Sequence, residues 1–187
     1  MTMAQEQDVV DLLLDQHNQI KGLFAQLAGA QGERKRELFQ DLVRLLAVHE
    51  SAEEIVVHPA AKRAAEVEQL VAERLHEEDE AKRELADLYD LGVEHPDFDT
   101  RLAKFADAVI RHASHEESEE FPALRRDVPA EELVRMAGAL RAAEAMAPTR
   151  PHPHSGESAA ANLLAGPPLA LFDKLRDGVR DWRQSNA

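Results

Sequence analysis

"HASHEESEEFPAL", residues 112–124, carries a spacing of histidine, glutamate and proline that occurs twice in the chain. The same spacing is found in "HESAEEIVVHPAA", residues 49–61. In each stretch a histidine stands four residues before the first of two adjacent glutamates, and a proline follows. Side chains four residues apart project from successive turns of one helix face. The repeat therefore predicts two helices that present a histidine–glutamate pair in the same way.

The residues around both stretches follow a helical pattern and not a strand pattern. Aromatic residues make up only 4% of the chain, so strand-forming runs are scarce, and apolar residues recur at helical spacing. The periodicity predicts helices over residues 8–27, 34–57, 66–91 and 98–124. Pro59 is expected to kink or stop the second of them. Long amphipathic helices joined by short turns predict an all-α fold, an up-down antiparallel four-helix bundle.

The chain continues beyond this bundle, which we assign to residues 1–127. Residues 128–147 are predicted to form an additional helix, and residues 148–187 a Pro-rich linker followed by a short C-terminal amphipathic helix. Apolar side chains share one face of that last helix: Phe172, Leu175, Val179 and Trp182. We expect this face to dock on the chain's own bundle, with a second copy or a partner protein as the alternatives.

Composition excludes several classes of function. The net charge of −14 disfavours binding to nucleic acid and to anionic membranes. The chain has no cysteine, which rules out disulfides, thiolate catalysis and iron–sulfur clusters. No apolar run reaches the roughly 18 residues of a membrane span, and the N-terminus lacks the pattern of a signal peptide. We therefore expect a cytoplasmic protein without nucleic-acid or membrane partners.

Polar residues interrupt the apolar stripes of the predicted helices at one depth of the bundle. On a helical wheel five of them face the core: His17, His49, Glu53, His112 and Glu116. Four other polar residues fall off the stripes and are expected to face solvent: His58, His115, Glu117 and Glu119. Burying a polar side chain without a partner is costly, so a cluster of five requires a physical reason.

The third helix is predicted to supply one more residue to this cluster. "QHNQIKGLFAQL", which begins at Gln16, aligns with "EEDEAKRELADL", which begins at Glu77, and the alignment pairs His17 with Glu78. Glu78 also lies on the apolar stripe of this helix, whereas His76 points to the opposite side. We therefore predict Glu78 as the contribution of the third helix. His76 is the alternative, and it requires a helix irregularity or a later helix start.

The predicted cluster has two explanations. A single buried histidine usually makes structural hydrogen bonds. Two H-x-x-x-E pairs with His17 at the same depth favour a metal site, because inward histidine and glutamate side chains build metal centres in helical bundles. Zinc prefers four ligands without a bridging pair, and calcium and magnesium prefer oxygen to three imidazoles. Di-iron carboxylate centres are built from such side chains in helical bundles, and manganese is the weaker alternative, because di-manganese bundles use a similar set of ligands.

A single histidine followed by H-x-x-x-E-E and a proline, in two helical hairpins, resembles the hemerythrin-like, HHE cation-binding family. The resemblance covers residues 8–125, about two-thirds of the chain. It implies a four-helix bundle that holds two non-haem iron ions. The metal ligands implied by the resemblance, with the third-helix residue predicted above, are His17, His49, Glu53, Glu78, His112 and Glu116.

The resemblance also implies a role for each ligand. His17 and His49 would bind one iron, and His112 with the third-helix residue would bind the other. Glu53 and Glu116 would bridge the two ions, with an oxo or hydroxo group between them. Oxygen-carrying hemerythrins have a H-x-x-x-H pair in the third helix, and this sequence lacks that pair.

Three functions are compatible with such a sequence. Carboxylate in place of imidazole favours ferric iron, and hence catalase-like or peroxidase-like chemistry on a small oxidant such as peroxide or dioxygen. No catalytic residue is then expected beyond the metal ligands. The second function is a module that senses or stores oxygen, nitric oxide or iron without turnover, with its output through the C-terminal tail. The third is a structural bundle without metal.

Overall fold

The structure, a computed structural model, describes residues 7–63, 68–146 and 168–185, and within these ranges it contains helices and no β-strand. The long helices are α1 (Val9–Leu27), α2 (Gly32–Ala52), α4 (Glu68–Leu91), α5 (Phe98–His115), α7 (Ala130–Met146) and α9 (Pro168–Ser185). Two short helices, α3 (His58–Arg63) and α6 (Phe121–Asp127), follow the π-helical turns η1 (Glu53–Val57) and η2 (Glu116–Glu120). The predicted all-α fold is confirmed.

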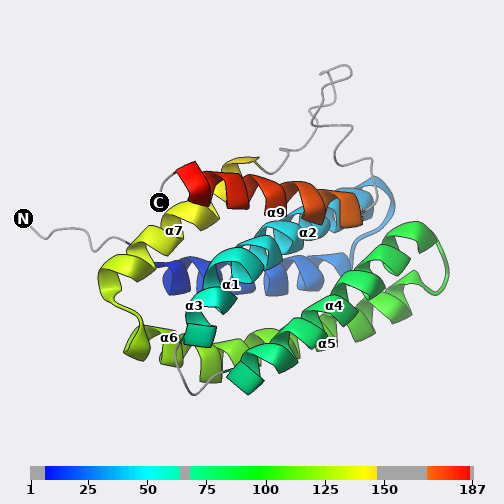
Figure 1. Cartoon of the computed structure of the whole chain (residues 1–187). Helices are drawn as coiled ribbons and strands as arrows, with labels where there is room; N and C mark the ends of the chain where they lie inside the picture. The colour runs from blue at the N-terminus through cyan, green and yellow to red at the C-terminus, as the bar shows by residue number, and fades with distance from the viewer. Residues whose placement is uncertain (1–6, 64–67, 147–167, 186–187) are drawn as a thin grey trace, which may run out of the picture.

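Two antiparallel hairpins form the body of the protein (Figure 1). α1 pairs with α2 and α4 pairs with α5, while α1 also contacts α5. α7 and α9 add to this body: they pack against each other and on α2, and α9 also reaches α4. None of the described helices combines the length and the apolarity that a membrane crossing requires.

Local sequence explains where α1 begins and which face it buries. The carboxylate of Asp8 accepts a hydrogen bond from the backbone N–H of Asp11, and the Asp11 carboxylate accepts one from the backbone N–H of Asp8. Arg125 of α6 pairs with both carboxylates and so joins the start of α1 to the end of the second hairpin. Two polar residues, Gln16 and His17, lie within the otherwise apolar buried face of α1.

Aromatic contacts close one end of the bundle. Phe24 of α1 packs edge-on against Phe105 of α5, with ring centroids 5.8 Å apart. Phe39 of α2 packs in the same way against Phe98 at the start of α5, at 5.1 Å. Edge-to-face pairs of this kind add to the hydrophobic gain of burial. They lie toward the α1–α2 and α4–α5 turns and leave the opposite half of the bundle to the polar cluster.

The second and fourth predicted helices are each interrupted by a π-helical turn. In η1 the backbone N–H of His58 donates to the carbonyl of Glu53, five residues earlier. In η2 the backbone N–H of Phe121 donates to the carbonyl of Glu116 in the same manner. Each π turn thus begins at the glutamate of a H-x-x-x-E pair. The two halves of the repeat share this irregularity as well as their side chains.

A proline follows each of these π-helical bonds. Pro59 directly follows His58, and Pro122 directly follows Phe121, the residues whose N–H groups donate these hydrogen bonds. Proline itself has no N–H to donate. Of the two effects expected of Pro59, a kink or a stop, the stop does not occur, because the chain continues into α3. A π turn holds about one residue more than an α turn, so the residues after it are rotated by roughly 100° from their predicted positions.

The C-terminal helix α9 docks on the bundle. Leu175 is buried, and Arg176 pairs with Glu54 of η1 at 3.3 Å. Of the three occupants considered for this apolar face, the structure shows the chain's own bundle. The side chains of Phe172, Val179 and Trp182, and the predicted linker at 147–167, lie outside the described residues.

Candidate metal centre

Six buried or nearly buried side chains meet in the middle of the bundle, from α1, α2, η1, α4, α5 and η2. They form two groups. Within each group every residue offers one nitrogen or oxygen atom, and these atoms all lie within 4.8 Å of one another. One group is His17, His49, Glu53 and Glu116; the other is Glu53, Glu78, His112 and Glu116. Two glutamates therefore belong to both groups. The six residues that the sequence predicted as ligands are the six that the fold brings together.

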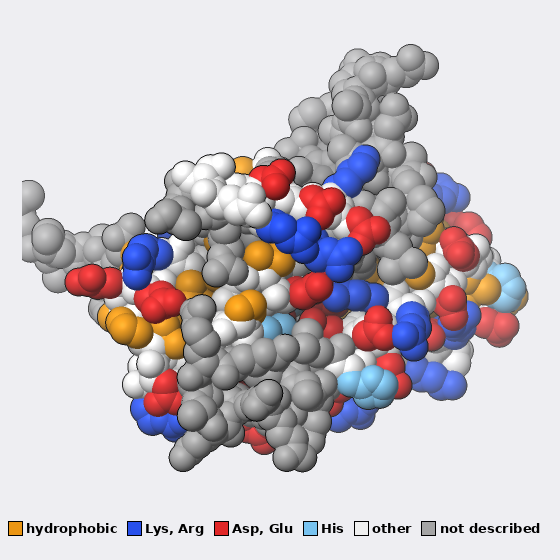
Figure 2. Space-filling model, in the orientation of Figure 1, with side chains coloured by type: hydrophobic (Ala, Val, Ile, Leu, Met, Phe, Trp, Pro, Cys, Tyr) orange, Lys and Arg blue, Asp and Glu red, His pale blue; other side chains and the backbone are white. Residues whose placement is uncertain are grey.

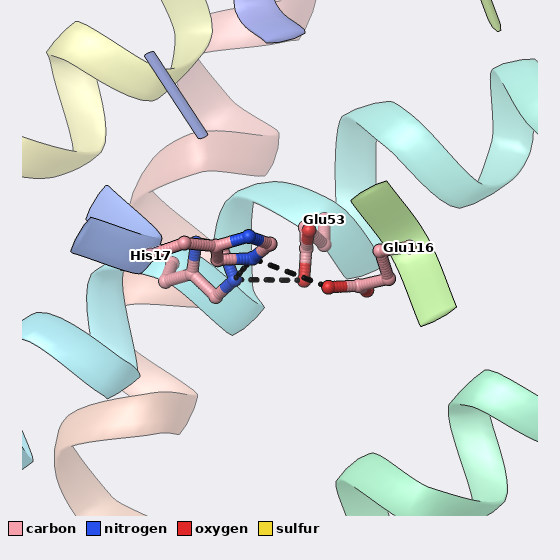
Figure 3. Close-up of side chains that lie close together, drawn as sticks. His17, Glu53 and Glu116 are labelled. Atoms are coloured by element: carbon pink, nitrogen blue, oxygen red, sulfur yellow. Dashed lines mark hydrogen bonds and ion pairs between the residues drawn. The ribbon is translucent and has the colours of Figure 1, made fainter. Parts of the chain in front are cut away.

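The distances within the first group are short. Nε2 of His17 lies 3.1 Å from Nε2 of His49 and 3.3 Å from Oε2 of Glu116. Nε2 of His49 lies 3.3 Å from Oε2 of Glu53. Figure 3 shows His17, Glu53 and Glu116 pointing toward one another from three separate elements. The ring of His17 also stacks on Phe121, with centroids 5.5 Å apart, which holds the imidazole in place.

Glu116 divides its two carboxylate oxygens between the groups. Oε2 faces His17, at 3.3 Å, while Oε1 lies 3.0 Å from Nε2 of His112 in the second group. A carboxylate bridges two metal ions when each of its oxygens serves one ion. The orientation of Glu116 is the one that such a bridge requires.

Each histidine of the cluster has its other ring nitrogen fixed by an acceptor. Nδ1 of His17 lies 2.8 Å from Oε1 of Glu117, and Nδ1 of His112 lies 2.8 Å from Oε2 of Glu77. A carboxylate can only accept, so each Nδ1 carries the proton and donates it. In the neutral ring that binds a metal, each Nε2 would face the cluster with its lone pair, which is the orientation of a metal-binding histidine.

The third histidine, His49, is fixed through a relay that reaches α7. Its Nδ1 donates to Oε1 of Gln16 at 2.9 Å, and Nε2 of Gln16 donates to Glu144 of α7 at 2.9 Å. Glu144 can only accept, so it fixes which end of the Gln16 amide faces the histidine. The additional helix α7 thus contributes to the orientation of a cluster residue.

This relay leads to a first testable prediction. Replacing Gln16 with leucine removes the acceptor of His49 and is expected to weaken metal binding by about 10–100-fold. Glu144→Ala should have a smaller effect in the same direction. The matched control is Gln19→Leu, because Gln19 is exposed on the same helix. Competition with a chelator measures the affinities, and equal affinities of Gln16→Leu and Gln19→Leu would contradict the relay.

The cluster leaves an unusual number of buried polar atoms without hydrogen-bond partners among the described residues. They include both carboxylate oxygens of Glu53, both of Glu116, Oε2 of Glu78 and Nε2 of His112. The lone pairs of His17 and His49 also face each other across 3.1 Å. Buried polar atoms normally have partners, and opposed lone pairs repel. Cations placed among these atoms would satisfy all of them, so the residues present fit a metal centre.

Electrostatics of the metal-free cluster follow from burial and from its many carboxylates. Burial, and then the neighbouring carboxylate of Glu116, raise the pKa of Glu53 well above its ordinary value. Burial likewise lowers the pKa of His49, with His17 acting in the same direction. Burial would raise the pKa of Glu116 too, but its contacts with His112 and His17 outweigh burial and lower it. Burial of charged groups is the main cost of this arrangement, and repulsion among the buried carboxylates adds to it.

The pKa shifts predict how the stability of the metal-free chain depends on pH. Burial raises the pKa of Glu50 from 4.5 to about 8. Despite burial, contacts with carboxylates raise the pKa of His112 from 6.5 to about 9 and that of His58 to about 10. All three groups hold protons more tightly in the folded chain. The folded chain therefore binds more protons than the unfolded chain between pH 7 and 10, and its stability falls as pH rises.

We expect the Tm of the metal-free chain to fall between pH 7 and pH 10. If each group lowers the free energy of unfolding by about 1 kcal/mol, it should lower the Tm by roughly 2–4 °C for a chain of this size. The pKa values of His49 and Glu116 are lowered instead. They change the stability only below about pH 7, so they do not offset this loss. Thermal unfolding followed by circular dichroism, with metal-loaded protein as the control, measures the change. A Tm that is constant or rises across this range would contradict the assignment.

His58 corrects one prediction from the sequence. It was expected to face solvent, but it is buried, with Nε2 2.5 Å from Glu78 and Nδ1 3.2 Å from Glu120. The π turn η1 rotates it inward, where it meets Glu120, the last residue of η2, which is also buried. The only sequence signal of the π turns was a proline after each motif, in a helix that continues beyond it.

Glu117 corrects a second prediction, because it is half-buried and binds both His17 and Lys21. His115 is partly exposed and Glu119 is exposed, as predicted. The side chain of His76 is 73% exposed, whereas Glu78 is buried in the cluster. The fold therefore places Glu78, and not His76, in the cluster of candidate ligands.

Comparison with known proteins agrees with this geometry. The family model for the hemerythrin HHE cation-binding domain matches residues 8–124, which include all six clustered side chains. The chain belongs to the hemerythrin HHE cation-binding family. With the cluster of histidine and glutamate that its fold assembles, it is a metal-binding hemerythrin-like protein.

Relatives of this hemerythrin-like chain include proteins of different length. It is 24% identical over 177 residues to an uncharacterized hemerythrin-like protein of Schizosaccharomyces pombe, covering 93% of this chain and 87% of that protein. It is 30% identical over 141 residues to a DNA nickase of Nostoc sp., covering 75% of this chain. The chain spans only 40% of the nickase's length, and the nickase name describes that longer protein.

A solved structure shares the fold. The crystal structure of a hemerythrin HHE cation-binding domain-containing protein from Mycobacterium kansasii superposes with a TM-score of 0.70 at 21% identity. The match covers 89% of this chain and 98% of the other, so it extends beyond the HHE domain itself. The shared fold therefore includes residues outside the range 8–124.

Proposed function

We propose that this hemerythrin-like protein holds a carboxylate-bridged pair of iron ions and uses it to decompose peroxide or reduce dioxygen. The orientation of Glu116 carries the proposal, because its two oxygens face histidines of two different groups. Glu53, which belongs to both groups, would form the second bridge. His17 and His49 would complete one metal position, and the other would be completed by His112 with Glu78.

The donor set indicates the kind of chemistry. The three carboxylates are hard, anionic ligands, and they stabilise ferric over ferrous iron. Iron, when bound, would accept two electrons from one peroxide molecule and pass them to another, which together give dioxygen and two waters. The side chains hold the ions at fixed positions, because each histidine is locked through Nδ1 and the cluster is shielded from bulk water. Small oxidants such as peroxide or dioxygen are the substrates that fit this reaction.

Metal analysis and oxygen evolution test the proposal together. Protein purified without chelators should contain about two iron ions per chain, as in other bundles of this ligand type, and should release oxygen from hydrogen peroxide. His112→Ala should lose most of this activity. His95→Ala is the control, because His95 is exposed in the α4–α5 turn. An iron-replete protein that releases no oxygen would refute the peroxide part, and a chain without stoichiometric metal would refute the whole proposal.

One observation supports a second candidate function, a sensing module without turnover. Arg176 of α9 pairs with Glu54, which is adjacent in the chain to Glu53, and Glu54 also lies 3.6 Å from Lys82 of α4. A change at the metal positions could therefore alter the docking of α9. Hydrogen exchange of α9 in the ferric and metal-free protein tests this, and equal protection in both states would rule the module out.

A further inference from the structure

A cavity of about 550 Å³ lies between the two hairpins and reaches the metal centre. Side chains of α1 and α2 form one side of it, and side chains of α4 and α5 form the other. A water molecule takes up about 30 Å³ in the liquid, so two metal ions with a peroxide molecule would fill on the order of 100 Å³. Most of the cavity is therefore not needed for a small oxidant. Volumes of this size hold organic molecules in other proteins.

The walls and the inner end of the cavity differ in character. Apolar side chains from both hairpins form much of its walls: Ile20, Leu46, Ala81, Phe105, Ala108 and Val109. His17, His49, Glu78 and His112 of the metal centre form its inner end. An elongated molecule would thus place an apolar body between the helices and a polar end group against the ligand cluster.

Charges around the cavity indicate which molecules are admitted. Six acidic and four basic side chains line it, and the acidic ones are paired too, as Glu77 is with His112, so neither sign of charge dominates. Two of the basic side chains already have partners: Lys21 pairs with Glu117, and Arg83 pairs with Asp79. Acidic and basic side chains are intermixed over the α4–α5 hairpin (Figure 2). The cavity therefore favours a neutral ligand.

We infer that this cavity binds a neutral organic hydroperoxide with an alkyl or aryl body, and presents its O–O–H group to the metal centre. The inference rests on the proposed function for the metal centre and names a further class of substrate. The apolar walls hold the organic body, and the cost of burying a charged carboxylate among them excludes carboxylate-bearing analogues. A molecule of about ten to fifteen heavy atoms suits the volume, by comparison with typical ligand pockets.

The reaction expected for this substrate is a two-electron reduction. The O–O bond of the hydroperoxide breaks, two protons are taken up, and the products are the corresponding alcohol and water. One electron comes from each of two ferrous ions, which become ferric. One equivalent of hydroperoxide should therefore oxidise one equivalent of the reduced di-iron protein.

Binding is tested with a compound that cannot react. The probe is 2-phenylpropan-2-ol, the alcohol formed from cumene hydroperoxide, titrated into the purified metal-loaded protein by calorimetry. We expect saturable binding at one site, and at least tenfold weaker binding of the para-carboxylate of the same alcohol. Absence of saturable binding, or equal affinity for the two compounds, would overturn the inference.

Filling the cavity distinguishes the organic substrate from hydrogen peroxide. Ala108 lines the cavity on α5 and is exposed, so Ala108→Trp should narrow the cavity without disturbing the core. Ala81→Phe narrows it from α4, and Ala103→Trp is the control on an exposed part of α5 outside the cavity. We expect the first two variants to weaken alcohol binding, and to raise at least tenfold the cumene hydroperoxide concentration that half-saturates the rate of oxidation of the reduced di-iron protein. Their KM for hydrogen peroxide should change less than twofold.

The outcomes separate this inference from the proposed function. Turnover of hydrogen peroxide without binding of the alcohol would refute the organic substrate and leave the proposed function standing. Alcohol binding that Ala108→Trp abolishes, in a protein without any peroxide turnover, would support the site and refute the function. Equal losses for both peroxides in Ala108→Trp and Ala81→Phe would also refute the inference.

Discussion

Replacing Glu53 with glutamine is expected to abolish stable metal binding and at the same time to stabilise the metal-free chain. Glu53 is completely buried and belongs to both ligand groups, so its loss weakens both metal positions. Loss of a bridging ligand should cost more than the roughly 10–100-fold that a supporting residue costs. After dialysis against a competing chelator, we expect the iron content of Glu53→Gln to fall well below one ion per chain.

The stabilising half of this prediction follows from the surroundings of Glu53. Burial comes first among the causes that raise its pKa, and Glu116, Glu78, Glu120 and Glu50 act in the same direction. A raised folded pKa means that the contribution of Glu53 to stability is lost as pH rises above 4.5 toward that pKa. Glutamine keeps the shape of the protonated acid and cannot ionise. The metal-free variant should therefore exceed wild type by about 1–4 kcal/mol at alkaline pH, with a smaller gap at pH 5.

Glu119→Gln is the matched control, because Glu119 is an exposed glutamate of η2. Its iron content and its Tm should stay close to those of wild type. Denaturant unfolding of the metal-free proteins at pH 5 and pH 9 measures the stabilities. A Glu53→Gln protein that keeps two ions, or one that is less stable than wild type at pH 9, would show that Glu53 is a structural residue and not a shared ligand.

Much of the metal centre could be predicted from the sequence because its residues break the apolar stripes. His17 and Glu116 stand where a leucine or valine would continue the pattern, and a polar residue at such a position is costly without a compensating partner. Glu78 was found from the internal repeat, which pairs it with His17. These inferences need only the regular α-helix upstream of each π turn, and there the ideal geometry holds.

The residues that support the cluster could not be predicted in the same way. His58 follows the π turn η1, so an ideal wheel places it on the wrong face. Glu77 and Glu117 look like ordinary surface acids, and their role depends on the exact direction of neighbouring histidines. Glu144 acts from α7, whose position against α1 no local pattern specifies. Helical periodicity thus found the residues that point inward, while the contacts between helices required the structure.

The second large effect is expected from His58. Replacing it with alanine leaves Glu78 and Glu120 buried without the imidazole that pairs with both. Breaking a buried pair by removing one partner typically costs about 3–5 kcal/mol, and we expect a loss of this size for the metal-free chain at pH 7. Glu78 also loses the contact that orients its carboxylate. Affinity for the second metal ion should therefore fall by about 10–100-fold, with a smaller change at the His17–His49 position.

Two further variants separate a role in positioning from general destabilisation. His76→Ala is the control, because the side chain of His76 is 73% exposed on the same helix as Glu78. His58→Gln keeps much of the volume and one donor, so it should recover part of the stability. Metal titration followed by visible absorption resolves the two binding steps. A His58→Ala protein that loses both steps equally would contradict the assignment of His58 to Glu78.

A double variant tests whether charge compensation and positioning are separate contributions of His58. Glu120→Gln removes one of the two carboxylates that His58→Ala leaves unpaired, so the double variant should be more stable than the sum of the single effects by about 0.5–3 kcal/mol. Glutamine at position 120 cannot hold Glu78, which lies on the other side of the imidazole. Metal affinity in the double variant should therefore remain as low as in His58→Ala. If stability and affinity recover together, His58 acts only through charge, and if neither recovers, Glu120 is not coupled to it.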